Sequence, residues 1–202
     1  MQQSGLVSVI VLNWNNFQDT IECINSLEYQ DYPIREFIVV DNGSTNQSVI
    51  EINRVLKGKM NLIVNNTNLG FSGGNNIGIR YALKQGAEYI LLLNNDTVVD
   101  DPQLISKLVS VYFNDKDIGL ACPTISHFSN PEVTWYAGAK YNLWRGGGVH
   151  IQEIPRIMEY IDTGYATGCC VMASRKLLDR VGFLDDKFFL YEEDVDLSLI
   201  HI

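Results

Sequence analysis

Four short apolar runs limit what this chain can fold into more than any other feature of its sequence. They cover residues 6–12, 36–40, 60–64 and 89–93, and none of them alternates between apolar and polar residues. A strand with one face in water alternates, whereas a strand covered on both faces is apolar along its length. Between the runs, apolar residues recur at helical spacing. The pattern therefore predicts an α/β fold, with helices flanking a mostly parallel sheet.

The length of the chain and its later texture predict one domain with a small irregular part. A chain of 202 residues, 46% of them hydrophobic, can build one substantial core, so a single domain over residues 1–202 is expected. Residues 131–161 combine aromatic side chains with a glycine run and show little periodicity, which is typical of irregular β structure or a mobile loop. Residues 165–173 then predict another strand, and residues 174–182 predict a short helix that ends at a glycine.

The charge of the chain excludes two classes of partner. It has 15 Lys and Arg against 24 Asp and Glu, which gives a formal net charge of -9. Nucleic acids and anionic membrane surfaces bind clustered positive charge, so neither is expected as a partner. An anionic ligand would have to be held by a cation or by backbone dipoles.

Cysteine usage and hydropathy indicate the compartment. The four cysteines have no spacing typical of a zinc site, and the vicinal pair Cys169 and Cys170 makes a poor disulfide. No apolar stretch approaches the ~18 residues of a membrane span, so no transmembrane segment is expected. We therefore expect the protein in the reducing cytoplasm, either free or at the inner face of the membrane.

Polar side chains gather where the predicted strands end. Because the carboxyl ends of parallel strands share one edge of a sheet, and ligands bind in the crevice outside that edge, these side chains are expected to converge on one site. Amides and carboxylates at strand ends also serve as turn and cap residues, and for any one cluster this simpler explanation is the better one. Three clusters on one edge favour a ligand site. They are Asn13-Trp14-Asn15, Asp41-Asn42-Gly43-Ser44 and Asn94-Asn95-Asp96.

The chemistry of this edge suits a nucleotide with a diphosphate. Asp41 can accept hydrogen bonds from a base or ribose, and the Trp14 ring offers a stacking face. Asp96 can reach a divalent ion that bridges a diphosphate. The glycine-rich residues 66–80 open a helix whose N-terminus is a natural neighbour for phosphate, with Asn75 and Asn76 as the side chains to test. The glycine spacing is not that of a dinucleotide-binding fingerprint.

An acidic segment supplies candidates for a general base. Residues 192–196 contain four carboxylates and follow the aromatic run 188–191, which we expect to anchor the segment in the core. A carboxylate held against apolar walls has a raised pKa and suits proton abstraction. The alternative is that these carboxylates only complement the dipole of a helix that begins here.

Five sequence blocks together resemble one known family. In chain order they are VSVIVLNWNN, VVDNGSTN, NLGFSGGNNIGI, LLLNND and GFLDDKFFLYEEDVDLSL. They resemble the family 2 glycosyltransferases of the GT-A fold, over nearly the whole chain from Val7 to Leu199. The resemblance implies an inverting transfer of a sugar from a nucleotide-diphosphate donor to an acceptor hydroxyl, with Mg²⁺ or Mn²⁺ as cofactor. Relatives continue with further helices, so the resemblance also implies that this chain is truncated at its C-terminus.

The resemblance assigns roles around the nucleotide. Asp41 would contact the base, and Asn13 and Trp14 would line its pocket. Asn75 stands where many relatives carry an Arg that faces the phosphates. Asn94 stands at the first Asp of the family's D-x-D motif, where it would meet the ribose.

The resemblance also assigns the metal ligand and the catalytic base. Asn95 is the middle residue of the D-x-D position and would belong to the cofactor-binding set. Asp96 would be the metal ligand. Asp194, the second residue of the family's Glu-Asp pair, would be the general base, with Glu193 as the alternative.

The substrates follow from one branch of the family. The GFSGG and NND variants resemble a rhamnosyltransferase-like branch that builds bacterial cell-surface polysaccharides, which implies dTDP-rhamnose or a UDP-sugar as donor and a glycan or lipid-linked acceptor. A noncatalytic module that binds a nucleotide sugar or a carbohydrate is the alternative function. A sugar-phosphate nucleotidyltransferase is disfavoured, because it should carry a basic, glycine-rich loop where this chain has NWNNF.

Overall fold

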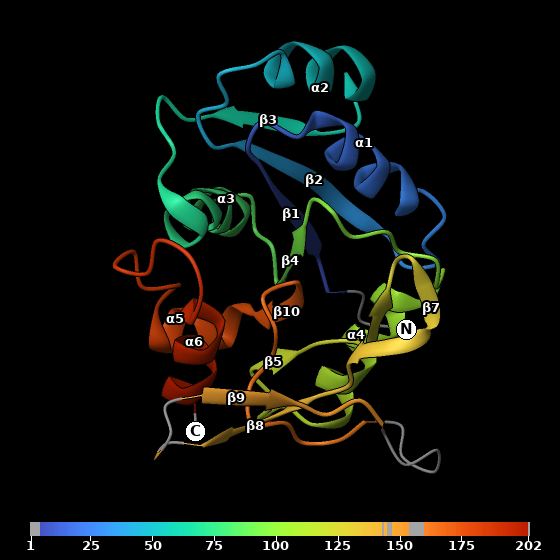
Figure 1. The fold of residues 1–202 in the computed structure, drawn as a ribbon, viewed down its shortest axis with the longest axis vertical. Helices are drawn as coiled ribbons and strands as arrows, with labels where there is room; N and C mark the ends of the chain where they lie inside the picture. Colours follow the sequence, from blue (N-terminus) through green and yellow to red (C-terminus); the bar gives the residue numbers. More distant parts are fainter. Residues whose placement is uncertain (1–4, 143, 145–146, 154–159, 202) are drawn as a thin grey trace.

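The structure is a computed structural model, and it describes residues 5–142, 144, 147–153 and 160–201. Figure 1 shows its ribbon. The elements follow in the order β1 Val7–Asn13, α1 Phe17–Ser26, β2 Ile34–Asp41, α2 Ser48–Leu56, β3 Asn61–Val64, α3 Gly70–Lys84, β4 Tyr89–Asn94, α4 Leu104–Asn114, β5 Leu120–Ala121, β6 Ile125–His127, β7 Asn130–Tyr136, β8 Ala139–Asn142, β9 Gly147–His150, β10 Cys170–Ser174, α5 Arg175–Val181 and α6 Glu193–His201.

A six-stranded sheet forms the centre of the fold, with the strand order β3-β2-β1-β4-β10-β5. The strands β3, β2, β1 and β4 are parallel, and β10 runs antiparallel to β4 and to β5. The predicted mostly parallel sheet is therefore confirmed. The order reverses at β1, since the chain first adds strands on one side of β1 and then places β4 on its other side. Such a reversal marks the usual position of a ligand crevice.

The continuous apolar runs reflect burial on both faces of the sheet. Val7, Val9 and Val11 of β1 pack in one core cluster with side chains of α1, α2 and α4. Ile10 of the same strand packs on the opposite face with side chains of α3, α5 and α6. Figure 1 shows α1 and α3 on opposite sides of β1 and β2. Most side chains of the central strand have apolar partners, and the buried Ser8 donates a hydrogen bond to Glu36, so alternation disappears from its sequence.

The predicted irregular region contains β structure. The strands β6 and β7 form one two-stranded sheet, and β8 and β9 form another. A third core cluster joins Tyr136 and Ala139 of this region to Val195 of α6. The interpretation of residues 131–161 as irregular β structure is confirmed for the part that is described, whereas residues 143, 145–146 and 154–159 lie outside it.

The predicted strand over residues 165–173 is only half right. The strand β10 begins at Cys170, whereas residues 165–167 belong to no strand and residues 168–169 form a turn. Here the backbone bonds elsewhere: the Gly168 amide donates to the Asp194 carboxylate, and Ala166 donates to Ser198 Oγ. The following short helix is confirmed, since Ser174 caps α5 and Gly182 ends it with φ 92°.

Among the described residues, no helix combines the length and the hydropathy needed to cross a membrane.

Candidate functional site

The ends of three parallel strands bring the predicted residues together at one edge of the sheet. In the strand register Asn13 lies opposite Asp41, and Leu12 lies opposite Asn94. Asn13, Asp41 and Asn94 therefore lie side by side on β1, β2 and β4, at the reversal of strand order. Residues that are as much as 81 positions apart in the sequence meet at one edge for the reason the sequence suggested: parallel strands end together.

Asp41 lies under this edge and holds it together. Its side chain is 0% exposed. Its Oδ2 atom accepts hydrogen bonds from Asn13 Nδ2 and from Ser44 Oγ, both at 2.7 Å. Its Oδ1 atom accepts from the Ser44 amide at 2.9 Å. A direct contact between Asp41 and a ligand would require one of these donors to move.

The loops after β1 and β2 are locked to each other and leave Trp14 free. Asn15 has φ 58° in the left-handed region. Its amide donates to Ser44 Oγ (2.8 Å), and its Oδ1 atom accepts from the Thr45 amide (2.8 Å). The Trp14 side chain remains 55% exposed. A rigid loop therefore presents an indole ring beside the buried Asn13 and Asp41, which suits stacking on a planar ligand.

The three polar side chains at and after the end of β4 differ in their exposure and partners. Asp96 is exposed, and the half-buried Asn94 side chain makes no hydrogen bond with any described residue. Asn95 instead turns inward, and its Nδ2 atom donates to Thr20 Oγ1 at 3.1 Å. Asp96 and Asn94 are thus available to a ligand, while Asn95 contacts α1. The prediction that Asn95 binds a ligand has no support in this geometry.

The first two backbone amides of α3 donate hydrogen bonds to other groups of the protein. The Phe71 amide donates to the Phe189 carbonyl (2.7 Å), and the Gly70 amide donates to Asn68 Oδ1 (2.8 Å). Gly70 has φ 77°, and a Cβ atom there would lie 2.4 Å from the Phe189 carbonyl oxygen. These amides are therefore not free for a phosphate, and the segment around Phe189 covers this end of the helix.

The two asparagines of α3 also serve the fold. Asn75 is buried, and its Nδ2 atom donates to the Phe71 carbonyl at 3.0 Å. Asn76 is buried and donates to the Leu184 carbonyl and to Asp186 Oδ1, both at 2.7 Å. Asn76 fastens the chain after α5 to α3. Contact of Asn75 with a phosphate stays a prediction, with its amide engaged inside the helix.

Asp194 lies next to the end of β4, although 100 residues separate it from Asn94. The Gly168 amide donates to Asp194 Oδ2 at 2.7 Å. The adjacent Cys169 carbonyl accepts from the Asn94 amide at 2.9 Å. The Asp194 carboxylate is therefore bound to Gly168, whose neighbour Cys169 bonds to Asn94 at the end of β4. Asp41 ends β2, Asp96 lies in the loop after β4, and Asp194 of α6 is connected to the end of β4 through Gly168 and Cys169.

Glu193 is the more deeply buried member of the acidic pair. It is 5% exposed, and its Oε2 atom has no hydrogen-bond partner among the described residues. Burial raises the pKa of Glu193, and the charges of Asp194 and Glu192 raise this pKa further. The expectation of a carboxyl group with a raised pKa is thus met at Glu193.

Replacement of Glu193 by Gln should change how stability depends on pH. A raised pKa means that the folded protein keeps a proton that the unfolded chain has lost, so the wild-type free energy of unfolding falls as pH rises above about 4.3 through the folded pKa. Because Gln does not ionise in this range, the Glu193→Gln variant does not lose this stability. The melting temperature of Glu193→Gln should exceed that of the wild type most at neutral pH, by about 2–4 °C for each kcal/mol of unfolding free energy that the wild type loses. The difference between the two melting temperatures should close near pH 4.

Thermal melts from pH 4 to pH 8 measure this difference. Glu132→Gln, at an exposed position of β7, is the matched control and should show a constant gap. A Glu193→Gln gap that does not vary with pH would contradict the assigned pKa direction.

The aromatic run before these carboxylates does not anchor the segment in the core, and that expectation was wrong. Phe189 is 59% exposed and Tyr191 is 74% exposed. Tyr191 and Glu192 have φ 72° and 69° in the left-handed region. These two residues turn the chain immediately before α6, so the segment loops outward and its aromatic side chains face solvent beside Asp194.

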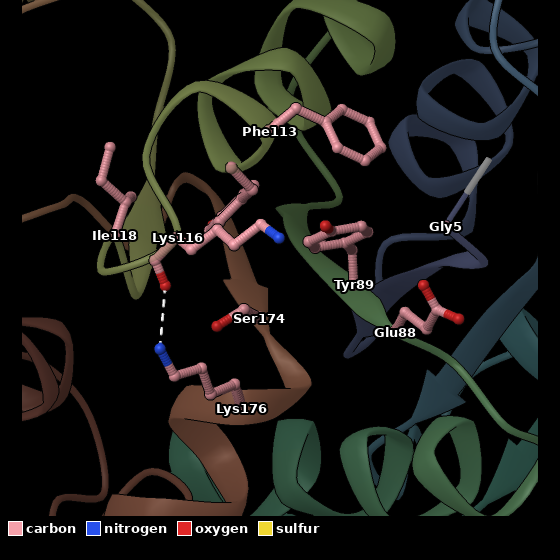
Figure 2. Close-up of a pocket in the computed structure, with 9 residues that line it drawn as sticks. Gly5, Glu88, Tyr89, Phe113, Lys116, Ile118, Ser174 and Lys176 are labelled. Carbon is pink, nitrogen blue, oxygen red and sulfur yellow. Dashed lines mark hydrogen bonds between the residues drawn. The ribbon is translucent and has the colours of Figure 1, made fainter. Parts of the chain in front are cut away.

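A cavity of about 450 Å³ lies elsewhere, at the amino ends of the strands. Figure 2 shows Gly5 before β1, Tyr89 at the start of β4 and Ser174 at the end of β10 around it. Lys176 Nζ donates to the Lys116 carbonyl at its rim (3.0 Å). None of the predicted site residues lines this cavity. The candidate site lies instead at the opposite edge of the sheet, at the carboxyl ends of β1, β2 and β4.

Sequence reasoning missed Thr20, and it placed Ser44 at the strand end without a role in the site. Both hydroxyls bond to Asn13 or Asp41 inside the site. Ser44 sits in the Asp-Asn-Gly-Ser turn and could have been noticed as a turn residue that bonds back to the aspartate. Thr20 lies on a helix face among apolar residues, and its sequence context gives no signal.

The chain is similar to known glycosyltransferases. The profile of "Glycosyl transferase family 2" matches residues 8–182. The low-salt glycan biosynthesis hexosyltransferase Agl10 of Haloferax volcanii is 28% identical over 97% of this chain. The dTDP-rhamnosyl transferase RfbF of Shigella flexneri is 26% identical over 97% of it. The chain spans 62% of the length of each of these relatives.

One solved structure shows the same fold. The mannosyltransferase PcManGT from Pyrobaculum calidifontis, in complex with GDP-Man and Mn²⁺, superposes with a TM-score of 0.72 at 17% identity. The superposition covers 99% of this chain and 52% of the mannosyltransferase. The likeness at this identity concerns the fold alone.

Proposed function

Because the chain belongs to glycosyl transferase family 2 and has the GT-A fold, we propose that it transfers a sugar from a nucleotide-diphosphate donor to an acceptor hydroxyl, with inversion at the sugar carbon. The observation that carries this proposal is the position of Asp194. A hydrogen bond from Gly168 holds its carboxylate beside the strand end that bears Asn94 and Asp96. A base and a donor site are thus adjacent.

The donor would lie across the ends of β1, β2 and β4. The exposed Trp14 ring stacks on the base, and Asn13 and Asp41 form the floor of the base pocket. The Asn94 side chain, which makes no hydrogen bond with any described residue, meets the ribose. In this arrangement the diphosphate reaches the loop that carries Asp96, on the side of Asp194.

The residues of this loop fit a hard divalent cation. Mg²⁺ and Mn²⁺ bind oxygen ligands, and Mg²⁺ is typically held by one or two carboxylates together with substrate phosphates and water. Asp96 offers one exposed carboxylate of this kind. Among the described residues, no group of three or more His, Cys, Asp or Glu could hold a metal ion. When bound, the cation would neutralise the charge that develops on the leaving diphosphate.

Asp194 would act on the acceptor. Its carboxylate accepts the proton of the attacking hydroxyl, which raises the nucleophilicity of that oxygen. The Gly168 amide fixes the orientation of the carboxylate. Attack on the face of the sugar opposite the leaving diphosphate would invert the configuration at the sugar carbon. Glu193, whose raised pKa favours the neutral form, is the alternative base.

The acceptor and the setting are proposed from the relatives and the exposed aromatic residues. RfbF is named as a dTDP-rhamnosyl transferase and Agl10 as a hexosyltransferase of glycan biosynthesis. We therefore expect dTDP-rhamnose or a UDP-sugar as donor and a glycan or lipid-linked acceptor in cell-surface polysaccharide synthesis. Phe189 and Tyr191 can stack on sugar rings. The four free cysteines fit the cytoplasm, including the inner face of the membrane.

A donor panel tests the function. The protein is incubated with dTDP-rhamnose, UDP-sugars and GDP-mannose in the presence of Mn²⁺ or Mg²⁺, and calorimetry measures nucleotide binding while release of nucleoside diphosphate measures transfer. We expect one base to bind in a metal-dependent way. Failure of every nucleoside diphosphate to bind with metal would contradict the proposal. Binding without turnover on any acceptor would favour the noncatalytic module.

A further inference from the structure

A line of buried hydrogen bonds joins the two halves of the candidate site. Asn13 Nδ2 donates to Asp41 Oδ2 at 2.7 Å, which connects β1 with β2. Thr20 Oγ1 of α1 donates to Asn13 Oδ1 at 2.8 Å. Asn95 Nδ2, in the loop after β4, donates to Thr20 Oγ1 at 3.1 Å. A single hydroxyl group thus links the floor of the base pocket to the loop that carries Asp96.

The Thr20 hydroxyl is needed at this position. Thr20 and Asn13 are both 0% exposed. Among the described residues, no other donor contacts Asn13 Oδ1. The hydroxyl also lies 2.9 Å from the Asn16 carbonyl, but that oxygen already accepts from the Asn95 amide group and from the Thr20 backbone. A hydroxyl has one proton, so its proton is required at Asn13, and its loss would leave a buried oxygen without a partner.

The helix α1 contacts the loop after β4 at a second point. Cys23 lies three residues after Thr20 and therefore on the same helix face. Its Sγ atom lies 3.5 Å from the Asn94 carbonyl oxygen. One face of α1 thus holds both Asn94 and Asn95, and so determines where the neighbouring Asp96 lies.

We propose that Thr20 is a positioning residue that couples nucleotide binding at Trp14 and Asn13 to cation binding at Asp96. This inference rests on the proposed function. A ligand that orders the base pocket fixes the position of the Asn13 side-chain amide. The Thr20 hydroxyl, which bonds to both Asn13 and Asn95, then fixes Asn95. This keeps the loop after β4 in the conformation in which Asp96 binds the cation. Coupling is reciprocal, so the cation must strengthen nucleotide binding by the same factor.

The test measures how much Mn²⁺ strengthens nucleotide binding in matched variants. UDP, dTDP and GDP are titrated by calorimetry with and without MnCl₂ into the wild type, Thr20→Val and Thr20→Ser. Thr20→Val keeps the side-chain shape and removes the hydroxyl, whereas Thr20→Ser retains the hydroxyl. Direct contact between cation and phosphates contributes coupling that Thr20 does not carry. We therefore expect the enhancement by Mn²⁺ to fall about fivefold or more in Thr20→Val, but not to vanish.

Two controls separate positioning from stability. Tyr112→Phe removes another buried hydroxyl, which donates to the Met172 carbonyl at 2.6 Å beside the cavity at the amino ends of the parallel strands, and should leave the enhancement unchanged. Thr20→Ser should restore it. If Thr20→Val does not fold, Asn95→Ala breaks the same line at its more exposed end and should lower the enhancement as well.

The outcomes distinguish failure of the coupling from failure of the proposed function. A reduced enhancement in Thr20→Val with affinity for metal-free nucleotide kept within about twofold supports the coupling. An unchanged enhancement in Thr20→Val and Asn95→Ala, or an equal loss in Tyr112→Phe, overturns it while the proposed function stands. If no nucleoside diphosphate binds the wild type with Mn²⁺, the proposed function fails, and the coupling falls with it.

Discussion

Asp194→Asn should lower the rate of sugar transfer by about 10²–10⁴-fold, the usual contribution of a general base. The amide has nearly the same shape, and its oxygen can still accept the hydrogen bond that Gly168 donates to Asp194 Oδ2 at 2.7 Å. The fold and the donor site should therefore remain intact. Steady-state kinetics at saturating donor measure the rate, and calorimetry with the nucleoside diphosphate and Mn²⁺ should give the wild-type affinity.

Glu193→Gln is the matched variant for this experiment, because it makes the same chemical change at the adjacent residue. Glu193 lies in the protein interior, with one carboxylate oxygen unpaired among the described residues. We expect this variant to keep most of its activity. Loss of transfer in Glu193→Gln together with retention in Asp194→Asn would reverse the assignment and make Glu193 the base.

Asp96→Ala should abolish the strengthening of donor binding by Mn²⁺. The residue offers the exposed carboxylate of the loop after β4, and Asn94 and Asn95 carry no charge that could replace it. Loss of an outer-shell partner of a metal typically costs 10–100-fold in metal affinity. Removal of the ligand itself should cost more than that. Titration of Mn²⁺ in the presence of the nucleoside diphosphate measures the change.

Asp100→Ala provides the control for charge. It removes another exposed carboxylate from the same loop, four residues further along the chain. Its metal affinity should remain close to that of the wild type. Equal effects of the two substitutions would mean that general negative charge attracts the cation, and Asp96 would lose its assigned role.

The sequence predicted best those features that depend on periodicity. Burial on both faces leaves a strand without polar positions, so β1, β2 and β4 could be located from their composition. Parallel strands end at one edge, so the convergence of Asn13, Asp41 and Asn94 could also be expected. Both conclusions follow from local geometry that every parallel sheet shares.

The direction of individual side chains could not be predicted in the same way. Asn94, Asn95 and Asp96 are adjacent in sequence, yet Asn95 turns toward Thr20 while Asp96 faces solvent. The aromatic residues 188–191 have the composition of a core segment, but left-handed backbone at Tyr191 and Glu192 turns them outward. In each case a partner or a turn elsewhere in the fold decided the outcome.

By itself, the sequence determined that this protein builds a covered, mostly parallel sheet and places amides and carboxylates at the ends of its strands. Only the tertiary structure decided which of these groups face a ligand and which hold the site together, and it alone brought Asp194 next to Asn94 through Gly168 and Cys169. The physical reason is that strand and helix patterns arise from neighbours along the chain. A hydrogen bond between distant residues is selected only once folding has brought its donor and acceptor together.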